Sequence, residues 1–318
     1  MSTELESTEL GSTELGSTEL ESSGEAAPVA AARQDEGRGS GAVRGYGRFF
    51  ASELRLVFRR RRNQLLLLVI FAFPVLIGIG LKIAAPHPNG GEGGGPQAFF
   101  NQLAGNGVFL TLIALQALLI LVLPLVVAVV AGDSIAGEAG YGTLRYLLTR
   151  PAGRARLLSV KYLAIISYGL VATFIIAVTG LIVGVIFFPV GPVTLLSGTT
   201  VSLASGLLRV LWVTLYIAAA MAALGAIGLA ISTLTEHAIG AIAAIMVLIV
   251  TSEVVDQVPQ FSAIAPYLPT HWWDSFDSLL RSPIDTTTLL QGLLSFLVYA
   301  VLFCSFAWAR FTTSDVTS

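Results

Sequence analysis

The sequence predicts an all-α integral membrane protein, and composition is the first reason. Of its 318 residues, 54% are hydrophobic and only 12% are charged, against roughly 25% charged in ordinary globular chains. The few polar residues could not cover the surface of a soluble core of that size. In addition, six apolar stretches are each long enough to cross a hydrocarbon core of about 30 Å as a helix. We place these transmembrane helices near residues 64–84, 108–131, 158–188, 207–232, 238–256 and 288–309.

Residues 1–45 are predicted to be a disordered low-complexity tail. Residues 2–21 are four copies of a five-residue unit, STELE or STELG, with one leucine in each copy. That apolar content is too small to offset the entropy of ordering the chain. The tail has no apolar core of the signal-peptide kind, so we expect the first span to direct membrane insertion.

Residues 46–62 are predicted to form an amphipathic helix at the membrane interface. Phe50, Leu54, Val57 and Phe58 fall on one side of it. Arginines recur on the opposite side. They are Arg48, Arg55, Arg59 and Arg62. A basic amphipathic helix that leads into a span favours contact with membrane lipids and their phosphates, and not with nucleic acid. The alternative is that the basic run only anchors the topology, and both interpretations can hold.

The distribution of Lys and Arg predicts the orientation of the six-span domain, residues 63–310. Nine bases precede the first span, five lie within residues 132–161 around the connection of the second and third spans, and Arg310 follows the last. Only Lys82, Arg209 and Arg281 remain for the other side. The positive-inside rule therefore places both termini in the cytoplasm, including the short C-terminal tail 311–318.

Small residues in two spans predict close helix packing. Gly180 and Gly184 form a small-xxx-small pair in the third span, and four alanines repeat every four residues in the fourth. Such stripes let helix backbones approach closely. We expect them to pack the subunit internally, with a dimer seam as the alternative.

The charged stretch between the second and third spans predicts a short helix within residues 137–150. Tyr141, Leu144, Leu147 and Leu148 share one helical face, and Pro151 ends the helix. An apolar face in water requires a covering surface. We interpret that surface as a separate protein.

Residues 257–287 differ from the other outer loops, because they contain four prolines and the run His271–Asp274. The pair Trp272 and Trp273 suits the membrane–water boundary, so we expect short helices that dip into the outer leaflet before the last span. Glu253, near the outer end of the fifth span, is a candidate for lining a path or outer gate with these tryptophans. An interfacial carboxylate beside an ordered loop is the alternative.

The sequence contains no pattern that predicts catalysis in this chain. It has no G-x-x-x-x-G-K-S/T phosphate loop, its three histidines are dispersed, and Cys304 is its single cysteine. We therefore expect no catalytic residue, no metal site and no cofactor here. The chain itself is not expected to be an enzyme.

Between the second and third spans the sequence resembles a known signature. Its residues here are Ala136-Gly137-Glu138, Gly142-Thr143-Leu144, Leu147-Leu148, Pro151, Arg154, Leu157-Leu158 and Lys161. This stretch is similar to the signature of ABC type-2 exporter permeases, and the resemblance extends over residues 46–310. It includes the outer segment Tyr267–Trp273.

That resemblance implies a permease subunit in the cytoplasmic membrane of a bacterium or archaeon. Two such subunits, as a homodimer or heterodimer, would pair with two copies of a P-loop ATPase subunit that binds ATP and Mg. Residues 137–150 would be the coupling helix on that ATPase and 46–62 the connecting helix. The implied ATPase interface comprises Glu138, Tyr141, Thr143, Leu144, Arg145, Leu147, Leu148 and Arg154. The apolar spans suit a hydrophobic or amphipathic substrate, as in multidrug or natural-product efflux.

Two other classes of function stay open. The chain could be a membrane-embedded docking or sensor protein that recruits a cytoplasmic partner without transport. A membrane enzyme is disfavoured, because no nucleophile, metal or acid–base constellation occurs.

Overall fold

The computed structural model describes residues 46–84, 106–140, 154–195 and 197–313. The chain divides into two compact units, residues 1–48 and 49–318. Of the first unit only residues 46–48 are described, and they are helical. Everything below concerns the second unit.

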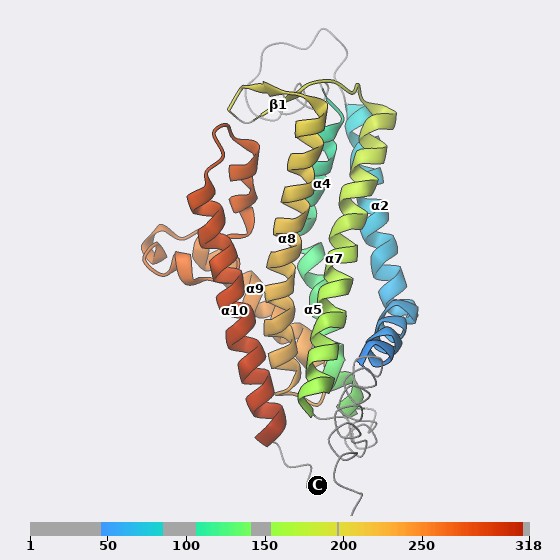
Figure 1. Cartoon of the computed structure of the whole chain (residues 1–318), viewed down its shortest axis with the longest axis vertical. Coiled ribbons are helices and arrows are strands. Elements are labelled where there is room, and N and C mark those ends of the chain that lie inside the picture. The colour runs from blue at the N-terminus through green and yellow to red at the C-terminus, as the bar shows by residue number, and fades with distance from the viewer. Residues whose placement is uncertain (1–45, 85–105, 141–153, 196, 314–318) are drawn as a thin grey trace, which may run out of the picture. The chain divides into compact units, whose positions relative to one another are not determined.

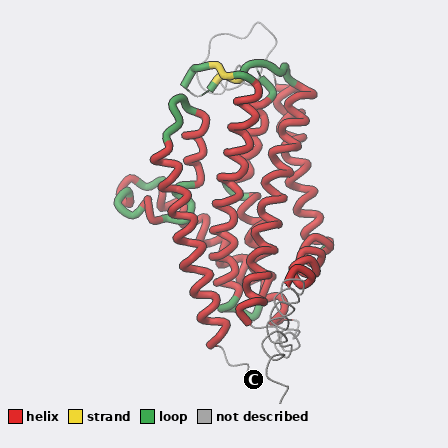
Figure 2. Tube along the Cα trace, in the orientation of Figure 1, coloured by secondary structure: helices red, strands yellow, loops and turns green. Residues whose placement is uncertain are grey.

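The second unit is a bundle of apolar helices (Figures 1 and 2). Five helices are long and apolar enough to cross a membrane, and a bent pair would make a sixth span. They are α2 (Arg61–Ala84), α7 (Arg154–Phe187), α8 (Leu203–Ser232), α9 (Ala238–Asp256) and α10 (Thr286–Thr313). The bent pair is α4 (Val108–Leu119) and α5 (Val122–Gly140), which meet at 52°. The chain is therefore a multi-pass helical membrane protein with five or six spanning elements.

The bent pair occupies the place of the second predicted span. The sequence predicted one helix over 108–131. The break lies just before Pro124, and α5 continues to Gly140. The helix is therefore longer than predicted, and it carries Asp133 and Glu138 on its last turns.

The amphipathic helix before the first span is shorter than predicted. It covers residues 46–59 and is interrupted at Arg60, after which α2 begins. Asn63 explains the break, because its side-chain amide donates to the Val57 carbonyl at 2.9 Å. This bond satisfies a carbonyl that the interrupted helix leaves open. The apolar stripe of the helix packs on the bundle core through Leu54, Val57 and Phe58.

Glycines bring α4 and α7 into backbone contact near one end of the bundle. A Cβ on Gly184 would lie within van der Waals overlap of the Gly107 carbonyl, and a Cβ on Gly180 would meet Thr111 Cα. The prediction that Gly180 and Gly184 pack helices within the subunit is confirmed. On α8, Ala218, Ala226 and Ala230 are likewise buried.

A β-hairpin, which the sequence did not predict, closes the end of the bundle near Gly107. Strands β1 (Val193–Thr194) and β2 (Thr200–Val201) pair antiparallel. Gly198 turns the chain with φ of 79°, a conformation that favours glycine. Two-residue strands have no alternation for a sequence pattern to show. We call this the hairpin end, and the opposite end, where α2 and α7 begin, the basic end.

Three short helices precede α10, as expected. They are η1 (Pro259–Phe261), η2 (Ala265–Tyr267) and η3 (Trp273–Leu280). Helix α9 has 19 residues against 30 in α8. At about 1.5 Å per residue, α9 is roughly 16 Å shorter. The three short helices fill the height that α9 leaves open.

Candidate functional site

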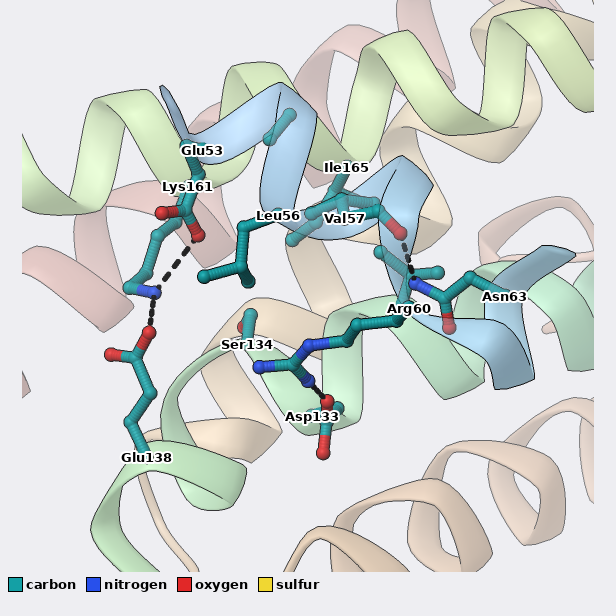
Figure 3. A pocket seen from close by; sticks show the side chains of 12 residues that line it. Glu53, Leu56, Val57, Arg60, Asn63, Asp133, Ser134, Glu138, Lys161 and Ile165 are labelled. Atoms are coloured by element: carbon teal, nitrogen blue, oxygen red, sulfur yellow. Dashed lines mark hydrogen bonds and ion pairs between the residues drawn. The ribbon is translucent and has the colours of Figure 1, made fainter. Parts of the chain in front are cut away.

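Charged side chains gather inside the basic end of the bundle (Figure 3). They come from the helix 46–59, the start of α2, the end of α5 and the start of α7. Residues of these segments line a cavity of about 20 Å³, which is room for about one water molecule. The structure thus uses this volume for side chains and leaves no space there for a larger ligand.

Lys161 is the centre of the first ion cluster. Its side chain is only 2% exposed, and Nζ lies 3.1 Å from Glu53 Oε1 and 2.6 Å from Glu138 Oε1. Both carboxylate side chains are 13% exposed. A buried ammonium is tolerated only when it is paired and hydrogen-bonded. This lysine therefore fixes the helix 46–59 and α5 to the first turns of α7.

Asp133 is the centre of the second cluster. Its carboxylate is 10% exposed and pairs with Arg60 and with Arg62, whose Nη2 lies at 3.1 Å. Gly137, one turn later on α5, leaves room for this carboxylate, since a Cβ there would overlap Asp133 Oδ1. The glycine of the Ala136-Gly137-Glu138 motif therefore has a packing reason in this chain.

The two clusters balance in charge. Three cations, Lys161, Arg60 and Arg62, face three carboxylates, Glu53, Glu138 and Asp133. We call these six residues the ionic junction. Because both clusters use residues of α5, any displacement of the end of α5 acts on α2, α7 and the helix 46–59 together.

Ser232, the last residue of α8, attaches that helix to the same turn of α5. Its hydroxyl donates to the Gly132 carbonyl at 2.9 Å and accepts from the amides of Ile135 and Ala136 at 3.1 and 2.9 Å. A side chain that enters a helix ladder in this way marks a place where the helix bends or adjusts. The residue is fully buried.

The break before α2 is also held from inside. Tyr168 on α7 donates its hydroxyl to the Asn63 carbonyl at 2.7 Å, and its ring lies 5.3 Å from that of Phe58. Tyr168 thus contacts the chain on both sides of the break, at Phe58 and at Asn63, and positions the turn from which Arg60 and Arg62 reach Asp133.

Glu138 occupies a different place from the one predicted for it. We expected it near the start of a short helix, facing a partner or the helix dipole. It lies instead near the C-terminal end of α5, where the dipole disfavours a carboxylate, and it pairs with Lys161. The buried cation compensates for that position. Helix α5 thus includes the first residues assigned to the 137–150 helix.

Most of the other residues predicted for an ATPase interface belong to a part of the chain that the structure does not describe. Tyr141, Thr143, Leu144, Arg145, Leu147 and Leu148 lie outside the described residues. Arg154 is the first residue of α7. The coupling-helix assignment therefore stays a prediction.

The four arginines predicted to share one face divide into two groups. Arg48, Arg55 and Arg59 are exposed on the helix 46–59. Arg62 belongs to α2 and pairs with Asp133, while 47% of its side chain stays exposed. Its assignment to the lipid-facing row stays a prediction.

The three predicted outer residues lie near the far end of α9, away from the ionic junction. Glu253 is partly buried on α9, whose neighbours form two hydrogen bonds to the outer segment. These bonds are Ser252 to Thr270 at 2.7 Å and Asp256 to His271 at 2.6 Å. The two tryptophans face different surroundings. Trp272 donates to the Pro266 carbonyl at 2.9 Å, whereas Trp273 is 3% exposed inside the core. Trp273 was expected at the membrane boundary, and the structure uses it as a core residue.

Within the described ranges, no three His, Cys, Asp or Glu side chains gather closely enough to hold a metal ion. Asp277, on η3, has a raised pKa because burial and the neighbouring Asp274 both disfavour its charged form. Arg281 opposes this shift.

Fold and site together define a class: multi-pass helical membrane proteins with a buried ionic junction at one end. The chain belongs to the family described as "Protein of unknown function (DUF2705)", whose model matches residues 92–317. It is also similar to the "Uncharacterized protein YhcI" of Bacillus subtilis (strain 168), with 32% identity over 63 residues. That match covers 20% of this chain and 20% of the relative. Neither description names a function.

Proposed function

We propose that the chain is the transmembrane permease subunit of an ATP-driven ABC exporter. Six spans and two cytoplasmic termini would sit in a bacterial or archaeal cytoplasmic membrane. A separate P-loop ATPase subunit, in two copies, would supply ATP hydrolysis with Mg. A second permease subunit would complete a homodimer or heterodimer, and the substrate would be hydrophobic or amphipathic.

The observation that carries the proposal is the ionic junction. It connects the end of α5, the start of α7 and the helix 46–59 by charge pairs, with Lys161 only 2% exposed. Residues 141–153, which include the middle part of the signature, connect α5 to α7 directly. A force applied to that connection would reach three elements at once. An externally driven permease requires such a joint between its docking segment and its spans.

The apolar character of the described spans also supports the proposal. Spans of ion-coupled transporters usually carry ionisable groups at mid-membrane. In the described bundle the charged groups lie at the basic end, on the last turn of α9 and in the segment after it, and at Lys82 and Arg209 near the hairpin end. Energy delivered by a partner suits such spans better than coupling to protons or sodium.

The test is co-purification of the full chain with a candidate P-loop ATPase subunit, followed by ATP hydrolysis in nanodiscs. Leu147→Asp places a charge on the face that is predicted to be covered by the partner, so we expect binding and stimulation to fall at least tenfold. Leu234→Asp is the matched control, because Leu234 is 56% exposed in the turn after α8.

Two results would contradict the proposal. If Leu147→Asp binds and stimulates the ATPase like the wild type, residues 137–150 are not the coupling helix. If a stable complex forms without ATP-dependent transport of any hydrophobic compound, the docking or sensor function takes the place of export.

A further inference from the structure

The run Arg59–Arg62 divides by whether a carboxylate partner is present. Arg60 and Arg62 pair with Asp133, although 35% and 47% of their side chains stay exposed. Arg59 and Arg61 are exposed, and so is Arg55, one helical turn before Arg59. We call Arg55, Arg59 and Arg61 the outward arginines. Because Asp133 does not pair with them, the outward arginines need a different explanation.

No carboxylate of this region balances the outward arginines. The one acidic residue in residues 46–62 is Glu53, whose side chain is 13% exposed and binds Lys161. Within the described part of the chain, the outward arginines make no ion pair and no hydrogen bond. They form a concentrated positive surface without an internal counter-charge.

The outward arginines lie directly before the exposed apolar side of α2. The exposed apolar side of α2 begins at Leu65, 61% exposed, and continues through Leu68, 59% exposed. Leu65 follows Arg61 by about one helical turn, roughly 6 Å along the axis. Lipid phosphates occupy this boundary in a bilayer, and the guanidinium fork matches phosphate oxygens. Leu56, 44% exposed next to Arg55, suits the same boundary.

The helix cannot use its apolar stripe to hold the membrane, because that stripe packs on the bundle core. Its outward side is therefore the only side of residues 49–59 that can meet lipid, and that side is basic. We infer that the outward arginines bind the headgroup phosphates of anionic phospholipids. This inference is independent of the exporter proposal.

The contact would also reach the ionic junction. Glu53 lies on the same helix as Arg55 and Arg59, and it binds Lys161. Arg60 and Arg62 flank Arg61 and bind Asp133. Headgroups that pull the helix 46–59 toward the bilayer therefore act on both ion clusters. Anionic lipid content is expected to change the position of the helix relative to α5 and α7.

The experiment measures lipid selectivity directly. The full chain is reconstituted in phosphatidylcholine vesicles with trace spin-labelled phosphatidylglycerol or spin-labelled phosphatidylcholine. Electron paramagnetic resonance then gives the preference of the protein surface for the anionic lipid. We expect Arg59→Gln to lower that preference by up to about fivefold at low ionic strength. Replacing all three outward arginines should lower it further, and salt should weaken the wild-type preference.

Arg281→Gln is the matched control, because Arg281 is an exposed arginine that lies shortly before the first residue of α10 and outside residues 46–62. The inference is overturned if the triple variant keeps the wild-type preference, or if Arg281→Gln has an equal effect. Inorganic phosphate is added at constant ionic strength to test the source of the anion. Loss of the lipid preference in its presence would show a site for free anions and would also overturn the inference.

Discussion

The basic end of the bundle and the outer segment 257–285 are held in place by different kinds of contact. At the basic end, buried charges join segments far apart in the sequence, with Lys161 reaching Glu53 and Glu138. At the far end of α9, the segment 257–285 is held mainly by bonds to backbone carbonyls and by the buried Trp273, with the side-chain pairs Ser252–Thr270 and Asp256–His271 beside them. Arg209 belongs to the second type, since it donates to the carbonyls of Leu279 and Arg281.

This difference indicates which contacts can change. An aromatic side chain in a packed core resists small shifts, because each lost contact leaves a void. Ion pairs constrain charge more than shape, and they can exchange partners when segments move. We therefore expect the segments at the basic end to move relative to one another, and the outer segment to keep its position. Variants that remove one element from each end test this comparison.

The largest effect is expected for Lys161→Met. It leaves Glu53 and Glu138 buried without their cation and should destabilise the fold by about 3–5 kcal/mol. Thermal unfolding in detergent measures this loss. Lys82→Met, which removes a bond to the Phe187 carbonyl and a cation–π contact with Phe188 but leaves no carboxylate of the described residues buried without a cation, is the control and should cost much less.

A triple variant distinguishes the charge imbalance from the loss of packing. Combining Lys161→Met with Glu53→Gln and Glu138→Gln removes all three charges, and replacement of a whole buried ion cluster is often close to neutral. Recovery of stability with loss of ATPase stimulation is the expected pair of outcomes. If the triple variant is as unstable as Lys161→Met, charge balance is not what the cluster provides.

A second, smaller effect is expected for Trp273→Ala at the other end. Trp273 lines a small cavity with Leu224 and Ile249, so truncation should cost about 3 kcal/mol, at the low end for buried tryptophan. The low end applies because the unfolded chain in detergent keeps apolar surroundings. Trp212→Ala, at a side chain 54% exposed, should change stability by less than about 0.5 kcal/mol. Equal costs for both variants would show that the outer segment is not wedged by its tryptophan.

The smallest effect is expected at Asp285, directly before α10. Hydrogen bonds from the Thr288 hydroxyl and amide, and from the Thr287 amide, lower the pKa of this carboxyl below its ordinary value of 3.8. The unfolded chain therefore takes up the proton first as pH falls. The contribution of the carboxylate is present above pH 3.8 and is lost as pH falls through the lower folded pKa. Asp285→Ala should thus be slightly less stable than wild type at pH 7, with the difference shrinking in acid. A difference that grows in acid would contradict this sign.

Much of the helical architecture could be predicted, because apolar length and Lys/Arg position are local properties. The ends of α2 and α9 lie within three residues of the predicted spans. The internal role of Gly180 and Gly184 was also predictable, since the spacing itself lets backbones approach.

The ionic junction could not be predicted from the same properties. Its pairs join positions about 70 and 108 residues apart, such as Arg60 with Asp133 and Glu53 with Lys161, and no periodicity connects such positions. Glu138 was placed near a helix start because the short helix was predicted within residues 137–150, and Gly137 stood at its beginning. That glycine instead makes room for Asp133, and the helix continues past it. One usable signal was available: Asp133 and Lys161 both stand at the edge of apolar runs, where an unpaired charge is costly.

The backbone contact of α4 with α7 has a mechanical consequence. A Cβ on either Gly107 or Gly184 would overlap the main chain of the other, so the two helices cannot approach further here and a relative tilt would pivot at this point. The contact is a fulcrum, and Lys161 lies 23 residues away from it along α7, about 35 Å. A tilt of about 5° at the fulcrum would displace the Lys161 end by about 3 Å over that length. Small angular changes near the hairpin end are thus large enough, at the other end of the lever, to make or break an ion pair.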